Sequence, residues 1–262
     1  MSSALAPLLA RSGQAALLFD VDGTLAPIAE RAQDARVPPR TVALLRELAE
    51  RYALVACVSG RRAADARRLV GIEGIAYAGS HGGELLEPGA QAARRAGALE
   101  VWVGRIGAEL LTPWKRELAR VGVRVEDKDP IVALHWRGAP DEEIAQTMLA
   151  RLAVGAEAAG LWTHWGRKVL ELRPPVVVSK GHAVRELVER SGARAALFGG
   201  DDSTDLDAFR ELDALTEEGA LDVAVRVGVR SDEGPAAIAQ QADLVVDGTE
   251  GFLAVLEVLA AR

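Results

Sequence analysis

The sequence predicts an α/β protein: an open, mostly parallel sheet with an α+β segment inserted into it. Short apolar runs alternate with amphipathic helical patterns near both ends of the chain, which is typical of parallel sheets. Acidic clusters directly follow two of these runs. The middle of the chain has a different order of elements. A length of 262 residues, 49% of them hydrophobic, is sufficient to bury such a core.

The two ends of the chain are predicted to form one discontinuous core domain, made of residues 1–85 and 174–262. In the first part we expect strands at 15–19, 53–58 and 75–78, with helices over about 40–51 and after Gly60. In the second part we expect a helix over about 180–190, after the run 176–178, and strands at 195–198, 222–227 and 244–246. Further helices lie between and after these strands.

Residues 86–173 are predicted to form a separately packed α+β domain that is inserted into the core domain. The pattern gives helices over about 99–120 and 141–159, and strands at 121–126, 131–136, 161–164 and 168–172. This order suggests helices on one face of a small antiparallel sheet. All five tryptophans fall in this segment. Core filling is the favoured explanation for each of them, and stacking against a ligand is the alternative.

Composition and charge narrow the class of protein. A net charge of −7 without a dominant basic patch argues against nucleic acid or a membrane surface as partner. Cys57 is the only cysteine and lies in an apolar run, so we expect an inert buried thiol in a reducing cytoplasm. The apolar stretch 4–10 is too short to span a bilayer and lacks the basic start of a signal peptide.

The acidic clusters predict a metal site. Asp20 and Asp22 follow the run 15–19, and Asp201 and Asp205 follow the run 195–198. Side chains at the carboxyl ends of strands meet in the crevice where open α/β sheets bind ligands. Carboxylates gathered so closely repel one another unless a cation lies among them, and hard oxygen ligands favour Mg²⁺. We therefore expect a Mg²⁺ site.

The same residues suit the hydrolysis of a phosphate monoester, which needs roughly 20 kcal/mol or more of barrier reduction. Asp20 is placed to attack phosphorus, and Asp22 to act as general acid and then base. Ser59, with Gly60 and the start of the next helix, suits a bound phosphate, although a serine there is commonly an N-cap. Lys180 begins a helix, where a cation is unfavourable, so we expect it to be paired with an anion rather than solvated.

These motifs resemble those of known families. Asp20-Val-Asp22-Gly23-Thr24, Ser59, Lys180 and Gly200-Asp201-Asp202-x-Thr204-Asp205 are similar to the four ordered motifs of the haloacid dehalogenase superfamily, which implies a Rossmann-like core. Further strings resemble the trehalose-6-phosphate phosphatase family: Val58-Ser59-Gly60-Arg61, Gly79-Ser80-His81-Gly82-Gly83-Glu84, Val125-Glu126-Asp127-Lys128, Leu134-His135-Trp136-Arg137, Glu171-x-Arg173-Pro174 and Asp205-x-Asp207-Ala208-Phe209.

The resemblance implies that residues 86–173 are a cap domain that sets substrate specificity, and it also implies roles for individual residues. It assigns the nucleophile to Asp20 and the acid/base to Asp22, and it assigns Mg²⁺ to Asp20, the Asp22 carbonyl, Asp201 and Asp205. Thr24, Ser59, Gly60 and Lys180 are assigned to the phosphate. Glu126, Lys128 and Glu171 are expected to bind sugar hydroxyls, with Arg61, His81 and Gly82 on the core side of the same pocket. For Glu126 and Lys128 the alternative is a surface ion pair at an exposed strand edge.

The resulting hypothesis is a monomeric Mg²⁺-dependent phosphatase that hydrolyses trehalose 6-phosphate, a small-molecule sugar phosphate, to trehalose and phosphate. Two alternatives are a phosphatase for another glycosyl phosphate and a catalytically silent sugar-phosphate-binding module. Leu206 departs from the family pattern, which usually has an acid there, and Trp136 stands where tyrosine is frequent. The first departure is expected to bear on substrate preference and not to abolish activity.

Overall fold

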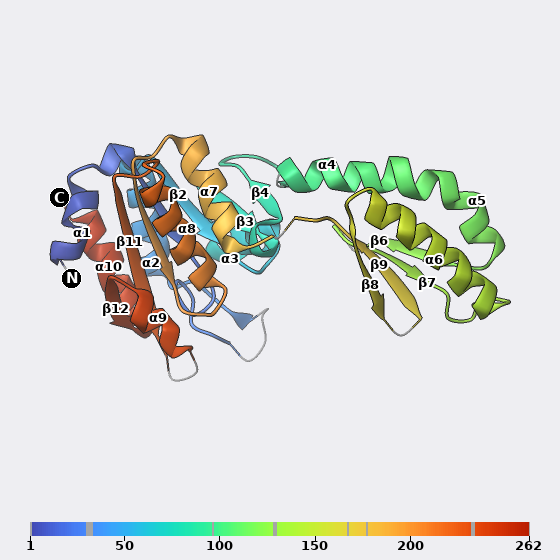
Figure 1. Cartoon of the computed structure of the whole chain (residues 1–262). Coiled ribbons are helices and arrows are strands. Elements are labelled where there is room, and N and C mark those ends of the chain that lie inside the picture. Colours follow the sequence, from blue (N-terminus) through green and yellow to red (C-terminus); the bar gives the residue numbers. More distant parts are fainter. Residues whose placement is uncertain are drawn as a thin grey trace. The chain divides into compact units, whose positions relative to one another are not determined.

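The computed structural model divides the chain into two compact units (Figure 1). The core unit comprises Met1–Arg94 and Val178–Arg262, and the inserted unit comprises Arg95–Val177. The inserted unit thus begins later than residue 86, because two further short strands join the core sheet first. The structure describes residues 2–29, 34–95, 97–127, 130–166, 168–176, 178–231 and 234–261.

The core sheet has the strand order β12-β11-β10-β1-β2-β3-β4-β5. All pairs from β12 to β3 are parallel, and β4 runs antiparallel to β3, so the predicted parallel sheet is confirmed. The first and last parts of the chain meet at its centre, where β1 pairs with β10. The strands are β1 Ala15–Phe19, β2 Leu54–Val58, β3 Ala76–Gly79, β4 Glu84–Leu86, β5 Arg94–Arg95, β10 Ala195–Gly200, β11 Val223–Arg230 and β12 Leu244–Asp247.

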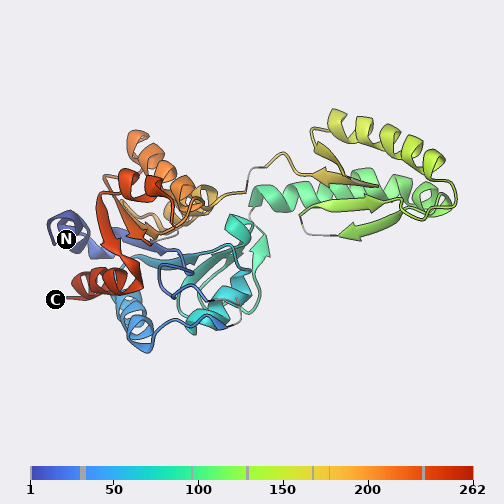
Figure 2. The ribbon, with the colours of Figure 1, turned by 90° about the horizontal axis from the view of Figure 1, so that it is seen from below.

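Helices cover both faces of this sheet, giving three layers (Figure 2). Residues of β1 alternate between the two faces because side chains of a strand have a period of two. One face packs against α1 (Ser2–Leu9), α2 (Pro39–Arg51), α3 (Ala63–Val70) and α10 (Gly248–Ala260). The other packs against α7 (Lys180–Ser191), α8 (Asp205–Glu217) and α9 (Ala236–Gln241). Short 3₁₀ turns occupy Ser12–Gln14 and Ser80–Gly82.

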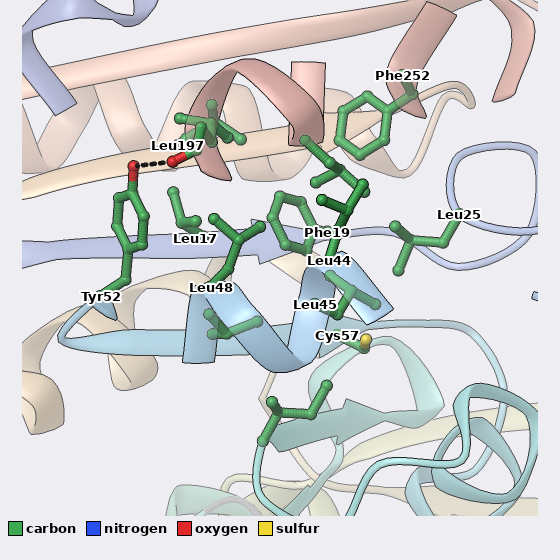
Figure 3. Close-up of a cluster of buried hydrophobic side chains, with 14 of the residues drawn as sticks. Leu17, Phe19, Leu25, Leu44, Leu45, Leu48, Tyr52, Cys57, Leu197 and Phe252 are labelled. Atoms are coloured by element: carbon green, nitrogen blue, oxygen red, sulfur yellow. Dashed lines mark hydrogen bonds between the residues drawn. The ribbon is translucent and has the colours of Figure 1, made fainter. Parts of the chain in front are cut away.

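The apolar cluster between the sheet and helices α1, α2, α3 and α10 lies at the centre of the core unit (Figure 3). Phe19 at the end of β1 contacts Phe252 of α10 edge to face, with ring centroids 5.6 Å apart. Leu45 of α2 lies in the same cluster. The Tyr52 hydroxyl donates a hydrogen bond of 3.2 Å to the Leu259 carbonyl. This packing holds the strand that leads directly into Asp20.

The inserted unit has an antiparallel sheet with the order β6-β7-β9-β8 and helices on one face (Figure 1). The predicted helix over 99–120 is present as α4 and α5, joined by a π-helical segment. The elements are α4 Gly97–Arg105, the π segment Ile106–Leu111, α5 Thr112–Arg120, β6 Arg124–Asp127, β7 Val132–His135, α6 Glu142–Ala158, β8 Trp162–Gly166 and β9 Val169–Arg173.

Core filling explains only some of the tryptophans. Trp136 is buried in the cluster of the inserted unit, and Trp102 and Trp114 pack against it. Trp162 and Trp165 are 50% and 41% exposed, respectively. The apolar stretch at 4–10 overlaps helix α1, which sequence patterning did not predict because it contains Pro7. Among the described residues, no helix has the length and apolar character needed to cross a membrane.

Replacing Phe252 by alanine is expected to lower the free energy of unfolding of the core unit by about 3–5 kcal/mol, because it removes a fully buried ring against β1. Chemical denaturation followed by circular dichroism measures the loss. Val154→Ala, at a position 67% exposed, is the control and should change stability by less than about 0.5 kcal/mol. Equal effects of the two substitutions would contradict the assigned packing.

Candidate functional site

The candidate site lies at the carboxyl ends of the central strands. Asp20 follows β1, Ser59 follows β2 and Asp201 follows β10. The backbone pairing continues into these positions: the Asp20 N–H donates to the Gly199 carbonyl at 2.8 Å, and the Ser59 N–H donates to the Ala78 carbonyl at 2.9 Å. The sheet register therefore places these side chains at one edge, as the strand-end motifs predicted.

Three carboxylates and one ammonium form the buried centre of this edge. Oxygens of Asp20, Asp201 and Asp205 lie within 4.8 Å of one another. The Lys180 ammonium lies 2.6 Å from Asp20 Oδ1 and 2.7 Å from Asp205 Oδ1, and Lys180 is only 2% exposed. The prediction that Lys180 is paired with an anion is confirmed. With all four groups ionised, this cluster carries a net charge of −2.

The charge excess is reflected in the pKa values of the carboxyl groups. Burial, followed by the charge of Asp205, raises the pKa of Asp20 well above its ordinary value. The same two causes raise the pKa of Asp201 to about 7. Burial lowers the pKa of Lys180, but Asp20 and Asp205 outweigh it, so the net shift is upward. An all-oxygen donor set with uncompensated negative charge fits a hard divalent cation.

Two glycines make this close packing possible. Gly23 has a φ of 87°, and a Cβ there would lie 2.1 Å from Asp201 Oδ2. A Cβ on Gly200 would lie 2.3 Å from Cγ of Asp205. Both distances are far below contact distance, and the neighbours are short carboxylate side chains. Any larger residue at either position would displace a member of the cluster.

Asp22 has different surroundings from the other acids. Its side chain is not part of the carboxylate cluster and instead accepts two hydrogen bonds from Arg61, from Nε and Nη2, each 2.6 Å long. These bonds raise the pKa of Arg61. The Arg61 backbone N–H donates to Ser59 Oγ at 3.1 Å. Asp22 and Arg61, expected in separate roles, thus form a bidentate pair whose geometry strongly fixes the carboxylate.

The helix expected directly after Gly60 begins only at Ala63. Ser59 is therefore not its N-cap. The first helical N–H, that of Ala63, donates to Glu84 Oε2 at 3.0 Å. A carboxylate thus occupies part of the helix start that was expected to face a phosphate.

A cleft of about 380 Å³ opens onto these residues. It is lined by Asp20, Asp22, Ser59, Gly60, Arg61, His81, Lys180, Asp202, Ile28 and Ala29. Sequence reasoning missed Ile28 and Ala29, which as isolated apolar residues carry no signal. Thr24 is buried, and its hydroxyl donates to Asp201 Oδ1 at 3.4 Å. Gly82 is also buried, and a Cβ there would lie 2.6 Å from the Ser179 carbonyl oxygen.

Asp202 lies just before helix α8, whose N-cap is Thr204, and binds backbone N–H groups at the start of that helix. Its Oδ1 accepts hydrogen bonds from the Thr204 N–H at 2.7 Å and the Asp205 N–H at 3.3 Å. Leu206, which replaces the usual acid, packs against the apolar cluster on the α7–α8 face of the sheet. Its position explains how an apolar side chain is accommodated next to a polar motif.

Two of the three expected sugar-binding residues of the inserted unit are described. Glu126 on β6 is exposed, and its Oε2 lies 2.7 Å from His135 Nε2. Glu171 on β9 accepts a hydrogen bond of 2.6 Å from Arg173 Nη2. Lys128 lies outside the described residues. The structure therefore brings Glu126 and Glu171 onto one small sheet.

Comparison with solved structures identifies the fold class. The structure of trehalose-6-phosphate phosphatase from Aspergillus fumigatus matches with a TM-score of 0.64 at 22% identity, covering 99% of this chain and 97% of that one. A trehalose-6-phosphate phosphatase related protein matches with a TM-score of 0.54 at 23% identity, covering 94% and 96%. The chain thus has the α/β fold of these phosphatases.

The chain belongs to the trehalose-phosphatase family, whose model matches residues 18–243. The predicted resemblance to this family is confirmed. A trehalose-phosphate phosphatase of Mycobacterium avium is 38% identical over 205 residues, covering 74% of this chain and 50% of the relative. An uncharacterised glycosyl hydrolase of Mycobacterium tuberculosis is 37% identical over 230 residues, covering 85% of this chain but 17% of the relative. The chain thus spans half or less of the length of these two relatives.

Replacing Lys180 by methionine is expected to lower the free energy of unfolding by about 3–5 kcal/mol near neutral pH, because it leaves buried carboxylates without their cation. Chemical denaturation measures this loss. Arg68→Met is the control: it removes an exposed ion pair with Asp65, which should cost less than about 1 kcal/mol. If the Lys180 variant were as stable as this control, the cluster would not depend on the ammonium.

Proposed function

We propose that this chain is a Mg²⁺-dependent phosphatase that hydrolyses trehalose 6-phosphate to trehalose and phosphate. The observation that carries the proposal is the buried cluster of Asp20, Asp201, Asp205 and Lys180, found at the strand ends in a member of the trehalose-phosphatase family. Relatives that match most of the chain are named trehalose-phosphate phosphatases. The only cysteine, Cys57, is free and buried, which supports the proposal that the enzyme is active in a reducing cytoplasm. We also propose that it is a monomer.

The proposed reaction has two displacement steps. In the first, a carboxylate oxygen of Asp20 forms a bond to phosphorus while the bond from phosphorus to the sugar oxygen breaks, and Asp22 gives a proton to the departing alkoxide. In the second, Asp22 takes a proton from water, whose oxygen attacks phosphorus and releases Asp20 and phosphate. The two hydrogen bonds from Arg61 support this role because they orient the Asp22 side chain.

Asp20, Asp201, Asp205 and the Asp22 carbonyl are proposed to hold Mg²⁺. When bound, this ion would offset the negative charge of the phosphoryl oxygens. The Ser59 hydroxyl, Gly60 and the Lys180 ammonium are proposed to bind those oxygens, and they line the same cleft as Asp20. Thr24 is proposed to act here through its hydrogen bond to Asp201.

Sugar recognition is proposed to involve Glu126, Lys128 and Glu171 of the inserted unit. Ionised carboxylates form strong, directional hydrogen bonds to hydroxyl groups. The hydrogen bonds from His135 and Arg173 support this proposal, because they restrict the orientation of Glu126 and Glu171. On the core unit, Arg61, His81 and Gly82 are proposed to complete the recognition of the sugar.

A panel of substrates tests this function directly. Phosphate release is measured from trehalose 6-phosphate, glucose 6-phosphate, sucrose 6-phosphate and glucosyl phosphoglycerate, with and without EDTA. We expect the highest kcat/KM for trehalose 6-phosphate, loss of release in EDTA and recovery with excess Mg²⁺. Preference for another member would replace the proposed substrate, and undiminished release in EDTA would contradict the proposed metal dependence.

The Asp20→Asn variant is expected to lose phosphate release by roughly a thousandfold or more, because an amide cannot replace the attacking carboxylate. Circular dichroism should show that the fold is retained. Asp207→Asn provides a matched control, since Asp207 belongs to the same acidic segment but pairs with Arg210 and does not line the cleft. Normal turnover by the Asp20 variant would exclude this residue as the nucleophile.

A further inference from the structure

One row of residues crosses the whole inserted sheet. Glu126, Ala133, Glu171 and His164 are successive cross-strand partners on β6, β7, β9 and β8. Directly opposed residues lie on the same face of a sheet. The other face is occupied by helices, because Leu134 and similarly placed residues of β9 belong to the cluster that packs against α5 and α6. We call the face of the Glu126 row the open face.

The side chains of β8 are assigned to the two faces by independent contacts. The Thr163 hydroxyl donates to Glu157 of α6, so Thr163 points to the helix side. Trp165 shares that parity and contacts the buried Trp136, with ring centroids 5.7 Å apart. Trp162 and His164 alternate with these residues and therefore emerge on the open face.

The open face combines fixed acceptors with an aromatic surface. Glu126 is held by His135, and Glu171 is held by Arg173, in both cases through partners on the same face. Trp162 is the cross-strand partner of Arg173 and is 50% exposed. His164, next along this side of β8, is also exposed. A large aromatic side chain left half in water beside oriented carboxylates is typical of a ligand surface rather than of a core.

We propose that Trp162 and His164 form a sugar subsite on the open face, together with the Glu126 row. The occupant is a glucose ring of the substrate, so this inference rests on the proposed function and extends it to β8. A pyranose ring has an apolar C–H face, which fits the Trp162 indole, and a rim of hydroxyls, which fits the His164 imidazole and the carboxylates.

Binding energy from this subsite would act on sugar substrates alone. A small ester such as p-nitrophenyl phosphate has no glycosyl ring, so it would be hydrolysed without contacting β8. The ratio of kcat/KM for trehalose 6-phosphate to kcat/KM for p-nitrophenyl phosphate therefore isolates the contribution of the open face from any change in the phosphoryl chemistry.

The test compares Trp162→Ala, Trp162→Phe and His164→Ala with Val154→Ala, whose exposed side chain lies on helix α6. We expect Trp162→Ala to lower the ratio about tenfold and His164→Ala about fivefold, mainly through KM, with Trp162→Phe between Trp162→Ala and the unaltered protein. Val154→Ala should leave the ratio unchanged. An unchanged ratio in the Trp162 and His164 variants, or an equal loss on both substrates, would overturn the proposed subsite.

The unaltered protein separates this inference from the proposed function. If it releases phosphate faster from another glycosyl phosphate, the proposed substrate is wrong, and the same ratio measured with that compound decides the role of β8. If it hydrolyses p-nitrophenyl phosphate but no glycosyl phosphate, both proposals fail. A lower ratio of kcat/KM values in the Trp162 and His164 variants, measured with whichever sugar ester the unaltered protein prefers, supports the subsite.

Discussion

The ion pair network centred on Lys180 is the constraint on which the core unit depends. A single buried ammonium binds the carboxylates of Asp20, directly after β1, and of Asp205, the first residue of α8, which lie 160 and 25 positions from Lys180 in the chain. Buried charges are costly unless they are paired, so these three segments gain stability only when they meet in this arrangement. The ion pairs thus hold together the same two parts of the chain that the β1–β10 pairing joins.

The acids of this network differ in the hydrogen bonds that their oxygens accept. Asp205 is satisfied at both oxygens, by Lys180 at one and by the backbone N–H groups of Asp201 and Asp202 at the other. It fixes the turn between β10 and α8. Burial raises the pKa values of all three acids, and the nearby charge of Asp205 adds to the shift for Asp20 and Asp201. Perturbed pKa values of this kind are concentrated at functional sites. In this cluster, Asp205 is therefore fixed by hydrogen bonds at both oxygens, whereas the negative charge of Asp20 and Asp201 favours the binding of a cation.

Sequence patterning was sufficient to predict the parallel core sheet and the acidic centre, because both are marked by residues that are close together in the sequence. Strand runs such as 15–19 and 195–200 are continuously apolar because both faces of a parallel sheet are covered, and polar residues then mark the strand ends. The Asp22–Arg61 pair was not predictable, because it depends on how two loops face each other. Strands β4 and β5 were missed because they are short, and α1 because its proline argues against a helix.

The two units have separate apolar clusters, and this separation bears on how specificity is built. The inserted cluster is made entirely of residues from α4 to β9, while the core clusters lie on the two faces of the parallel sheet. The open face of the inserted sheet contributes little to either cluster, since alternate residues of β7 and β9 carry the packing. Side chains such as Trp162 and His164 are thus free of the packing constraints that fix Asp20 and Lys180. Substitution of Trp162 or His164 would therefore remove no member of the apolar cluster of the inserted unit or of the carboxylate cluster of the core unit.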